Sequence, residues 1–389
     1  MTHGNSPATI TGIKIRWIAL RMWIHLFRIA LDEYRSYKDV LKTLHAMLTL
    51  RKKFAGENHT TKMIGANGRF YWNMHLPGFP SIIFDQHFLG AMNRTIPVRS
   101  LHNRLAILFL GITRRCPLKC RHCYDWAPGQ QDDTLSVTEL QTIISKYLEK
   151  GISQVFFLGG EPMVRFDDLV KLVRYIDGKS ETWFSTCGYQ LDKEKVSILK
   201  EAGLTGVMIS IDHFDQQKHN AIRGHEQAFD WAMNATQNAV DAGLLSCWSL
   251  CLTPELIDLQ KLLTYTALAA SCHVNFVNIL EPMAAGRYAG KNVTIDSQGL
   301  NILEEFYLQM NRDPLYSQFP IIVYDGYFSR RLGCLGAGNR YLYIDSLGHA
   351  HPCPFCRSSI EINALSDPAE TQLDNLKDQG CLLKINDED

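Results

Sequence analysis

Six apolar segments alternate with amphipathic segments between residues 104 and 280, and this rhythm constrains the fold more than any other feature. The apolar segments cover residues 105–113, 154–160, 181–188, 205–212, 244–252 and 273–280. The segments between them have the periodicity of helices, near 135–150, 167–178, 192–202, 226–242 and 255–270. Buried strands that alternate with helices form βα units and a parallel sheet. The sequence therefore predicts an α/β fold, a partial (β/α)6 barrel of the TIM kind.

Short polar or glycine-rich motifs stand where these predicted strands end. A C-x3-C-x2-C loop follows the first strand and GGEP (159–162) ends the second. STCG (185–188), SID (210–212) and NILEP (278–282) end the third, fourth and sixth. In barrels of this kind the chemistry lies at the carboxyl ends of the strands. We therefore expect these motifs to meet on one rim.

The three cysteines of the first loop are Cys116, Cys120 and Cys123. Three thiolates could hold zinc, but a structural zinc site usually has four protein ligands, and no fourth cysteine lies nearby. A cubane of four irons normally takes four cysteines as well. With three, one iron keeps an open position at which chemistry can occur, so an iron–sulfur cluster is the favoured occupant.

At these residues the sequence resembles the radical SAM superfamily, whose signature is C-x3-C-x-Φ-C after the first strand of a partial barrel. The resemblance covers about residues 105–285, and His122 stands at the Φ position, which is usually aromatic. It implies a 4Fe–4S cluster on the three cysteines and S-adenosyl-L-methionine (SAM) on the open iron. It also implies that the reduced cluster cleaves SAM to a 5′-deoxyadenosyl radical, which abstracts hydrogen from a substrate.

The resemblance further implies a set of SAM contacts. The GGEP motif is expected near the methionine amino group, Ser210 and Asp212 near the ribose, and His122 near the adenine. Arg223 is expected to pair with the methionine carboxylate. Ser185 belongs to the same rim, although Cys187 stands where relatives usually have Asn before the glycine. The predicted cofactor-binding residues are His122, Gly159, Gly160, Glu161, Pro162, Ser185, Ser210, Asp212 and Arg223.

A second group of cysteines follows residue 320, where the βα rhythm stops. Cys334, Gly348 and Cys353 give C-x13-G-x4-C around a predicted hairpin that turns at residues 346–348. This resembles the opening of the SPASM or twitch extensions, which hold auxiliary 4Fe–4S clusters. Cys356 and Cys381 are the remaining thiols, so we expect one auxiliary cluster. A zinc knuckle or an unoccupied remnant is the alternative. Four protein ligands would favour electron relay, and three would leave an iron for substrate.

Residues 13–36 form one predicted helix with Lys14, Arg21, His25, Arg28, Asp32 and Arg35 on one face and large apolar residues on most of the rest. Residues 1–60 contain ten Lys or Arg against four Asp or Glu. The helix either packs on the enzyme body or a partner, or lies in a membrane interface with its tryptophans and basic residues at headgroup depth. Arg21, His25 and Arg28 interrupt the apolar residues of this segment, so it lacks the apolar run of about 20 residues that a membrane span needs. The segment also lacks the features of a signal peptide.

The predicted domains are a basic amphipathic helical extension (1–60), a small β-rich segment (61–103), the barrel (104–320) and the cysteine module (321–389). The formal net charge is zero, so charge gives no argument for a nucleic-acid partner. Eleven cysteines in a chain this long are not a disulfide scaffold, and we expect a cytoplasmic protein. Cysteines in apolar segments, at 187, 247, 251 and 272, are expected to be buried small hydrophobes.

The leading functional hypothesis is a radical SAM enzyme acting on a peptide or protein, supplied with electrons by a reductant such as flavodoxin or ferredoxin. The same chemistry on a lipid or isoprenoid at the membrane surface is the alternative that residues 13–36 suggest. A non-catalytic iron–sulfur or zinc sensor or scaffold is the alternative from another class. Asp212, Asp325 and Tyr327 are the only candidates that the sequence offers for a catalytic acid or base.

Overall fold

The computed structural model describes residues 6–34, 36–55, 61–97, 105–126, 133–334, 336, 338 and 340–377. Its centre is one sheet with the strand order β10-β9-β8-β7-β6-β5-β4-β11-β12. Every pair in this sheet is parallel except β11 with β12. The strands are β4 (Ile107–Gly111), β5 (Gln154–Leu158), β6 (Glu181–Thr186), β7 (Gly206–Ser210), β8 (Leu245–Cys251), β9 (Phe276–Leu280), β10 (Ile321–Val323), β11 (Tyr341–Ile344) and β12 (Ala350–His351).

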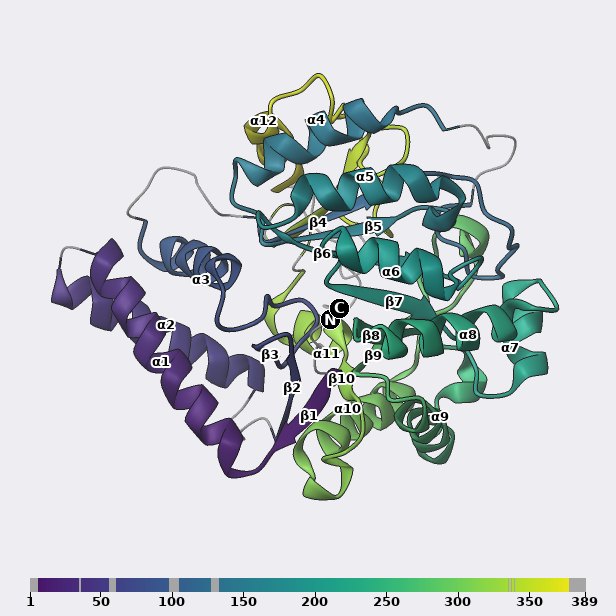
Figure 1. Cartoon of the computed structure of the whole chain (residues 1–389), viewed down its shortest axis with the longest axis horizontal. Helices are drawn as coiled ribbons and strands as arrows, with labels where there is room; N and C mark the ends of the chain where they lie inside the picture. The colour runs from purple at the N-terminus through teal and green to yellow at the C-terminus, as the bar shows by residue number, and fades with distance from the viewer. Residues whose placement is uncertain are drawn as a thin grey trace.

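Helices connect the parallel strands and cover the outer face of the sheet (Figure 1). They are α4 (Val137–Leu148), α5 (Phe166–Ile176), α6 (Lys193–Glu201), α7 (Gln216–Arg223), α8 (Ala228–Asp241), α9 (Leu259–Ser271), α10 (Ser297–Arg312) and α11 (Asp325–Leu332). Short 3-10 turns lie at Pro162–Arg165, Pro254–Leu256, Gly286–Tyr288 and Pro314–Tyr316. The predicted partial barrel is confirmed, and it is open because no pairing joins β10 to β12.

The amphipathic helices begin where their sequences provide N-terminal caps. Ser136 and Glu139 form a capping box at the start of α4, and Asp192 caps α6 through the Lys195 amide. The apolar faces of these helices join the outward side chains of the strands in one large buried cluster. The inward side chains, including Phe156, Trp183 and Phe276, form a second cluster inside the barrel.

An N-terminal unit packs against this barrel. It has a three-stranded antiparallel sheet and three helices: β1 (Ala8–Thr11), β2 (Lys62–Ala66), β3 (Arg69–Tyr71), α1 (Ile13–Glu33), α2 (Tyr37–Ala55) and α3 (Ile82–Thr95). Figure 1 shows α1, α2 and α3 together on one side of the barrel. The segment expected to be β-rich therefore also contains a helix. Ser81 caps α3 by accepting from the Phe84 amide, with Asp85 in the first turn.

The N-terminal unit closes the barrel at the amino ends of its strands. Glu181, the first residue of β6, accepts hydrogen bonds from the Tyr71 hydroxyl and the Gly78 amide. Gln154, the first residue of β5, donates to the Met74 carbonyl at 2.9 Å. Side chains of β2 and β3 join the cluster inside the barrel, so residues 61–79 form its floor.

The C-terminal segment extends the barrel sheet. Strand β11 pairs in parallel with β4, and β12 turns back on β11 in the hairpin that the sequence predicts. Helix α12 (Ala369–Lys377) follows. Strand β10 pairs with β9, so the sheet continues past the predicted boundary at residue 320. In the part of the chain that the structure describes, none of the helices has the length and hydropathy needed to cross a bilayer.

Lys62 is a buried side chain that joins the N-terminal unit to the barrel, and burial lowers its pKa to about 7. Its Nζ donates to the carbonyl oxygens of Tyr316 (3.0 Å), Phe319 (3.0 Å) and Pro320 (2.8 Å). The side chain is fully buried at the first position of β2. Three carbonyl groups in the connection before β10, of which that of Pro320 is buried, thus share one donor.

Replacing Lys62 with methionine should lower the free energy of unfolding by about 2–4 kcal/mol, because three acceptors, of which one is buried, lose their donor while the length of the side chain is kept. Urea unfolding followed by circular dichroism measures this. The matched control is Lys38→Met at an exposed position of α2, which should change the unfolding free energy by less than about 0.5 kcal/mol. Equal effects of the two substitutions would contradict the role of Lys62.

Candidate active site

The loop after β4 is held by its backbone, which leaves its cysteine side chains free to face a ligand. The Gly160 and Glu161 amides donate to the carbonyls of Thr113 (2.7 Å) and Arg115 (2.9 Å). The loop also donates two hydrogen bonds to the end of α7. The Lys119 amide donates to the Arg223 carbonyl (3.2 Å), and the Arg121 amide donates to the Ile222 carbonyl (2.9 Å). Two separate βα units therefore fix the path of this loop.

Cys116, Cys120 and Cys123 line one cavity of about 950 Å³. Burial raises the pKa of the half-buried Cys123 thiol to about 11, so a thiolate there needs a cationic partner. Among the described residues, no three His, Cys, Asp or Glu side chains are placed to hold a single metal ion. A cubane binds each thiolate on a different iron, so the three cysteines fit a 4Fe–4S cluster better than a single zinc ion.

Gly159 and Gly160 allow the end of β5 to lie directly against the cysteine loop. Gly159 has φ +136°, and a Cβ there would meet Thr113 O at 2.2 Å. A Cβ on Gly160 would meet Arg115 O at 2.3 Å. Both glycines line the cavity, so their exposed backbone is available to a ligand amino group.

The carboxylate of Glu161 points into the protein and not into the cavity. It accepts from the Thr186 hydroxyl (2.8 Å), the Cys187 amide (2.7 Å) and the Met163 amide (3.0 Å). Burial raises its pKa despite these three donors. Glu161 thus braces the ends of β5 and β6, and Pro162 lies buried in the turn that follows. Within GGEP, only the two glycines line the cavity.

Asp212 is a buried anion that links three parts of the site. Its Oδ2 lies 2.6 Å from Arg223 Nε and 2.8 Å from His122 Nε2, and its Oδ1 accepts from the Cys251 amide at 3.1 Å. Burial alone would raise the pKa of Asp212, but the Arg223 guanidinium and His122 hold it well below its usual range. Asp212 does not line the cavity. The ribose contact and the catalytic role of Asp212 therefore stay predictions.

Arg223 and His122 both line the cavity beside the cysteines. Arg223 is nine-tenths buried, and its Nη1 lies 3.7 Å from Cys120 Sγ. Asp212 raises the pKa of Arg223 against the effect of burial, so the guanidinium stays charged. The pairing of Arg223 with a ligand carboxylate stays a prediction, and the structure places this cation where such a pair could form.

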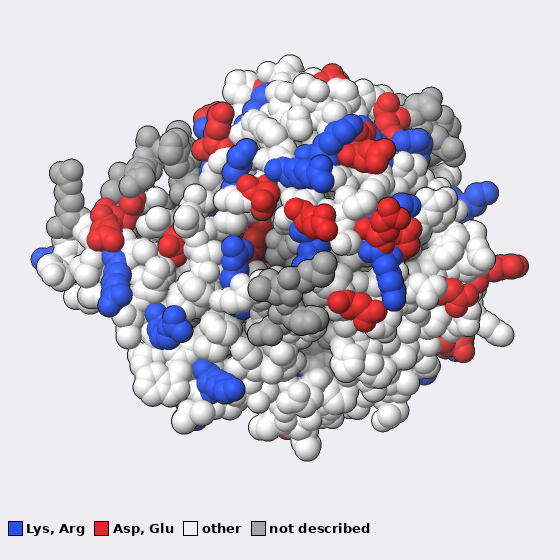
Figure 2. All heavy atoms as spheres, in the orientation of Figure 1, with Lys and Arg blue, Asp and Glu red and all other residues white. Residues whose placement is uncertain are grey.

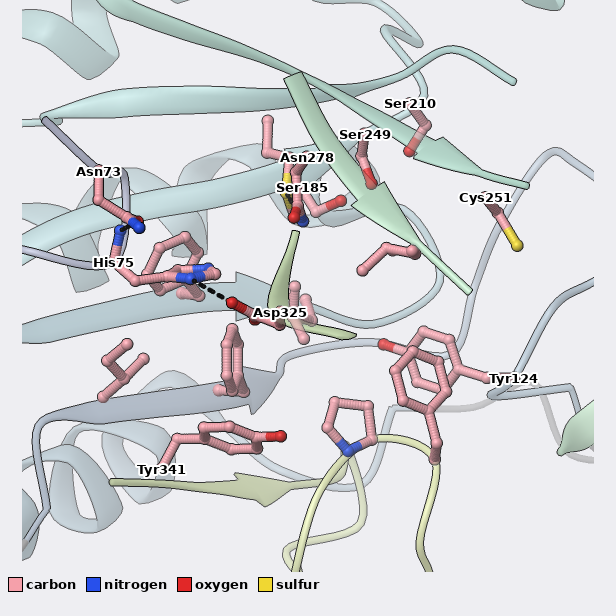
Figure 3. A pocket seen from close by; sticks show the side chains of 18 of the residues that line it. Asn73, His75, Tyr124, Ser185, Ser210, Ser249, Cys251, Asn278, Asp325 and Tyr341 are labelled. Atoms are coloured by element: carbon pink, nitrogen blue, oxygen red, sulfur yellow. Dashed lines mark hydrogen bonds and ion pairs between the residues drawn. The ribbon is translucent and has the colours of Figure 1, made fainter. Parts of the chain in front are cut away.

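A row of polar side chains crosses the ends of three neighbouring strands. Ser210 on β7 is paired in register with Ser249 on β8, and Ser249 with Asn278 on β9. Figure 3 shows these residues and Ser185 in the cavity wall. The Oδ1 atom of Asn278 is buried and has no hydrogen-bond partner among the described residues. An orphaned acceptor in a cavity wall fits a bound hydroxyl or amino group.

A second polar group lies across the cavity from this row. His75, in the loop after β3, lies 3.6 Å from Asp325 at the start of α11, and Asn73 lies beside it (Figure 3). Burial would raise the pKa of Asp325, but His75 lowers it. The predicted candidate Asp325 thus lines the cavity, whereas Tyr327 does not. The Tyr327 ring packs on Tyr307 at a centroid distance of 4.8 Å, which is a core role.

The C-terminal cysteines lie beside the same cavity. Cys353 and Cys356 are bridged by their backbones, and the Cys356 amide donates to Cys353 Sγ at 3.2 Å. Pro354 and Phe355, which lie between these two cysteines in the sequence, line the cavity, so Cys353 and Cys356 lie close to its wall. Burial raises the pKa of Tyr341, which also lines the cavity. Cys381 falls outside the described residues, and the fourth ligand stays a prediction.

Several cavity residues were not identified from the sequence. They are Asn73, His75, Thr186, Cys187, Met208, Ser249, Cys251 and Asn278. Ser249 and Asn278 carry a signal in hindsight, since each is a polar residue near the end of an apolar strand. Cys187 and Cys251 were expected to be buried hydrophobes, and they are largely buried while also lining the cavity.

Known proteins resemble this chain in sequence and in fold. Residues 110–255 match the model of the Radical SAM superfamily. The GTP 3′,8-cyclase of Vibrio parahaemolyticus is 30% identical over 148 residues, which is 36% of this chain and 44% of that protein. The Fe-coproporphyrin III synthase of Methanosarcina barkeri is 34% identical over 140 residues, which is 36% of this chain and 35% of that protein. The chain thus spans less than half the length of these two curated relatives.

Two solved structures extend the similarity in fold beyond this range. Streptococcus suis SuiB bound to its precursor peptide SuiA has a TM-score of 0.58 and 16% identity, covering 70% of this chain and 65% of SuiB. The protein anSMEcpe with bound AdoMet has a TM-score of 0.53 and 19% identity, and the match covers 69% of this chain and 80% of anSMEcpe. At these identities the similarity concerns the fold, and it supports the partial barrel.

Acidification should destabilise the protein through His219, which holds Asp212 in place. Its Nδ1 accepts from the Asp212 amide at 3.1 Å, and burial lowers its pKa to about 4. The unfolded histidine has a pKa of about 6.5 and binds the proton first. The stability from the neutral ring is therefore complete above about pH 6.5 and is lost as the pH falls to about 4, by about 3 kcal/mol.

Urea unfolding at pH 7 and pH 4.5 tests this through His219→Gln. The variant should lose less stability between the two pH values than the wild type does. His45→Gln, at an exposed position of α2, is the matched control and should keep the wild-type pH dependence. An unchanged pH dependence in His219→Gln would refute the assignment.

Proposed function

We propose that this chain is an enzyme that cleaves SAM reductively and takes a hydrogen atom from a substrate in the cavity, and the match of residues 110–255 to the Radical SAM superfamily supports this proposal. One observation carries this proposal: Cys116, Cys120 and Cys123 share a single cavity with the GGEP glycines, Arg223 and the polar row of β7–β9. When bound, a 4Fe–4S cluster with SAM on its open iron supplies a 5′-deoxyadenosyl radical. The protein contributes the positions of the ligands and the exclusion of water.

The side chains divide this work between them. We assign the cluster to the three cysteines, the amino group of SAM to the backbone of Gly159 and Gly160, and its carboxylate to Arg223. The orphaned Asn278 Oδ1 and the hydroxyl groups of Ser249 and Ser210 offer partners for the hydroxyl groups of a nucleoside. Asp212 and Glu161 act through other residues, since their carboxylates are engaged within the chain. They keep Arg223, His122 and the end of β5 in place.

We further propose an auxiliary 4Fe–4S cluster on Cys334, Cys353, Cys356 and Cys381. Its support is that Cys353 and Cys356 are bridged by their backbones and flank Pro354 and Phe355, which line the cavity. With four ligands the auxiliary cluster would relay electrons from a reductant such as flavodoxin or ferredoxin. With three ligands it would leave an iron for the substrate, and metal and sulfide analysis of Cys381→Ala distinguishes the two cases.

The substrate class is the open part of this proposal. A peptide or protein remains the expectation from the SPASM-like cysteine pattern, and the fold similarity to peptide-bound SuiB leaves it open. The cavity favours a different class, because most of its wall between the cysteines and α1–α3 is apolar, with Phe109, Phe156, Leu158 and Met208 on the barrel side. Such a wall suits a hydrocarbon better than a peptide backbone, which needs hydrogen-bond partners.

The cleavage of SAM is the direct test. Anaerobically reconstituted protein, given dithionite and SAM, should form 5′-deoxyadenosine even without substrate, as measured by liquid chromatography with mass spectrometry. Cys120→Ala should lose the product because the cluster loses a ligand, and its iron content should fall by about four atoms when the cubane is not held. Cys272→Ala, which replaces a cysteine outside the cavity, is the matched control. It should keep both the formation of 5′-deoxyadenosine and the iron content of the wild type.

A fully loaded wild-type protein that forms no more 5′-deoxyadenosine than Cys120→Ala would refute the radical mechanism. The sensor or scaffold alternative predicts a further result, unchanged SAM binding after Glu161→Ala combined with Arg223→Ala. Equilibrium dialysis with labelled SAM measures this, and the enzyme proposal expects binding to weaken by about tenfold or more, since a buried cation and a buried brace are lost.

A further inference from the structure

The cavity that holds the cysteines extends to the helical part of the N-terminal unit. At that end most of its wall consists of apolar side chains from three helices and the adjoining strands, and His87 and Arg94 of α3 are its polar members. The apolar residues are Ile15, Ala19, Met22, Trp23 and Leu26 of α1, Met47 of α2, Phe88 and Ala91 of α3, and Met63 and Trp72. A radical SAM barrel needs no such wall to bind its cofactor. The extension therefore supplies space for an apolar chain that runs from the helices to the cysteines.

The outer side of α1 is also apolar, and its large side chains are exposed in the part of the chain that the structure describes. Ile13 (71% exposed), Trp17 (63%), Leu20 (50%), Ile24 (46%) and Phe27 (37%) recur every three or four residues along one stripe. The buried face of the same helix contains Ile15, Ile18, Leu26 and Ala30. A helix that only covers a core needs one apolar face. The second face indicates contact with another apolar phase.

Helix α2 repeats this arrangement. Tyr37 (73% exposed), Leu41 (61%) and Leu48 (38%) lie on one stripe, and the neighbouring Val40 packs in the core shared with α1 and α3. The stripe residues of both helices are exposed, so both stripes face outward from that shared core. Their combined length is far beyond the scattered single hydrophobic residues of an ordinary surface.

Basic side chains border these stripes. On α1, exposed Lys14, Arg21 and Arg28 follow one edge of the apolar stripe, and Arg16 lies at the other. On α2, Lys38 and Lys42 are exposed. Figure 2 shows blue groups spaced along a largely white surface where Figure 1 places α1. Tryptophan and large aliphatic residues flanked by Lys and Arg match the interface of a bilayer that contains anionic lipids. A protein partner would not explain why the inner face of α1 lines the cavity.

We infer that α1 and α2 lie on an anionic bilayer and that the cavity beneath them takes the apolar chain of a membrane lipid, which places a C–H bond of that chain near Cys116, Cys120 and Cys123. This inference rests on the proposed function for the chemistry, but its membrane contact does not. One set of helices thus serves two purposes. Their outer faces bind the bilayer, and their inner faces line the route by which a chain reaches the cysteines.

Vesicle sedimentation of the full-length protein tests the membrane contact. Wild type should pellet with phosphatidylcholine vesicles that contain one-third phosphatidylglycerol and pellet much less with phosphatidylcholine alone. Trp17→Ser combined with Ile24→Ser, both at exposed positions, should weaken binding by about tenfold or more. Leu315→Ser, which removes another exposed apolar residue (81%), is the matched control and should bind as wild type does.

A lipid with one pyrene-labelled acyl chain, added in the same vesicles, tests the cavity. Pyrene fluorescence should be quenched by tryptophan or tyrosine of the wild type, and Ala19→Phe, which narrows the apolar end, should reduce the quenching while vesicle sedimentation stays unchanged. Equal quenching in wild type and Ala19→Phe would overturn the cavity part of the inference. Failure of wild type to pellet, or equal pelleting of all variants, would overturn the membrane part.

The formation of 5′-deoxyadenosine separates this inference from the proposed function. Product without vesicle binding would leave the enzyme proposal standing and refute the lipid inference. Vesicle binding and quenching without product, from fully loaded protein, would refute the enzyme proposal and leave the lipid site in place. If a soluble protein extract, and not vesicles, increases product formation, a peptide or protein is the substrate and the lipid inference is wrong.

Discussion

Four backbone hydrogen bonds hold the cysteine loop, and the rest of the site depends on them. They run from Gly160 and Glu161 to the start of the loop, and from Lys119 and Arg121 to the end of α7. Backbone groups buried at such a junction must be paired, so the loop cannot change its path without losing several partners. The loop therefore does not use its cysteines to maintain its own shape. It presents three thiols whose positions are set by two different βα units.

The polar interactions around this loop follow from the same junction. Asp212 at the end of β7 pairs with Arg223 in α7, and it reaches His122 within the loop. Glu161 joins the end of β5 to the end of β6. Buried carboxylates are costly unless cations or several donors satisfy them, and both are satisfied here. Their role is to keep neighbouring strand ends aligned, so that the cations and glycines beside the cavity have fixed positions.

The sequence predicted those parts of the molecule that depend on local pattern. Apolar strands, amphipathic helices and the cysteine loop were found because their signals lie within a few residues of each other. Ser249 and Asn278 were missed because their value lies in the register between neighbouring strands, which one strand does not reveal. The contribution of Asn73 and His75 was missed because it depends on how a separate unit docks. The parallel pairing of β11 with β4 joins residues more than 200 positions apart, and no local sequence pattern predicts it.

That last pairing has a consequence for how the molecule is built. Strand β4 leads directly into the cysteine loop, and one of its edges is completed by a strand that is synthesised more than 200 residues later. Pairing between such distant segments forms late, because the entropy of closing the long loop must be overcome before the contacts can form. The first half of the barrel can therefore be in place while this edge of β4 is still open. During that interval the cysteine loop is reachable from the side that β11 and β12 later cover, so the maturation of the metal site and the completion of the sheet are ordered in time.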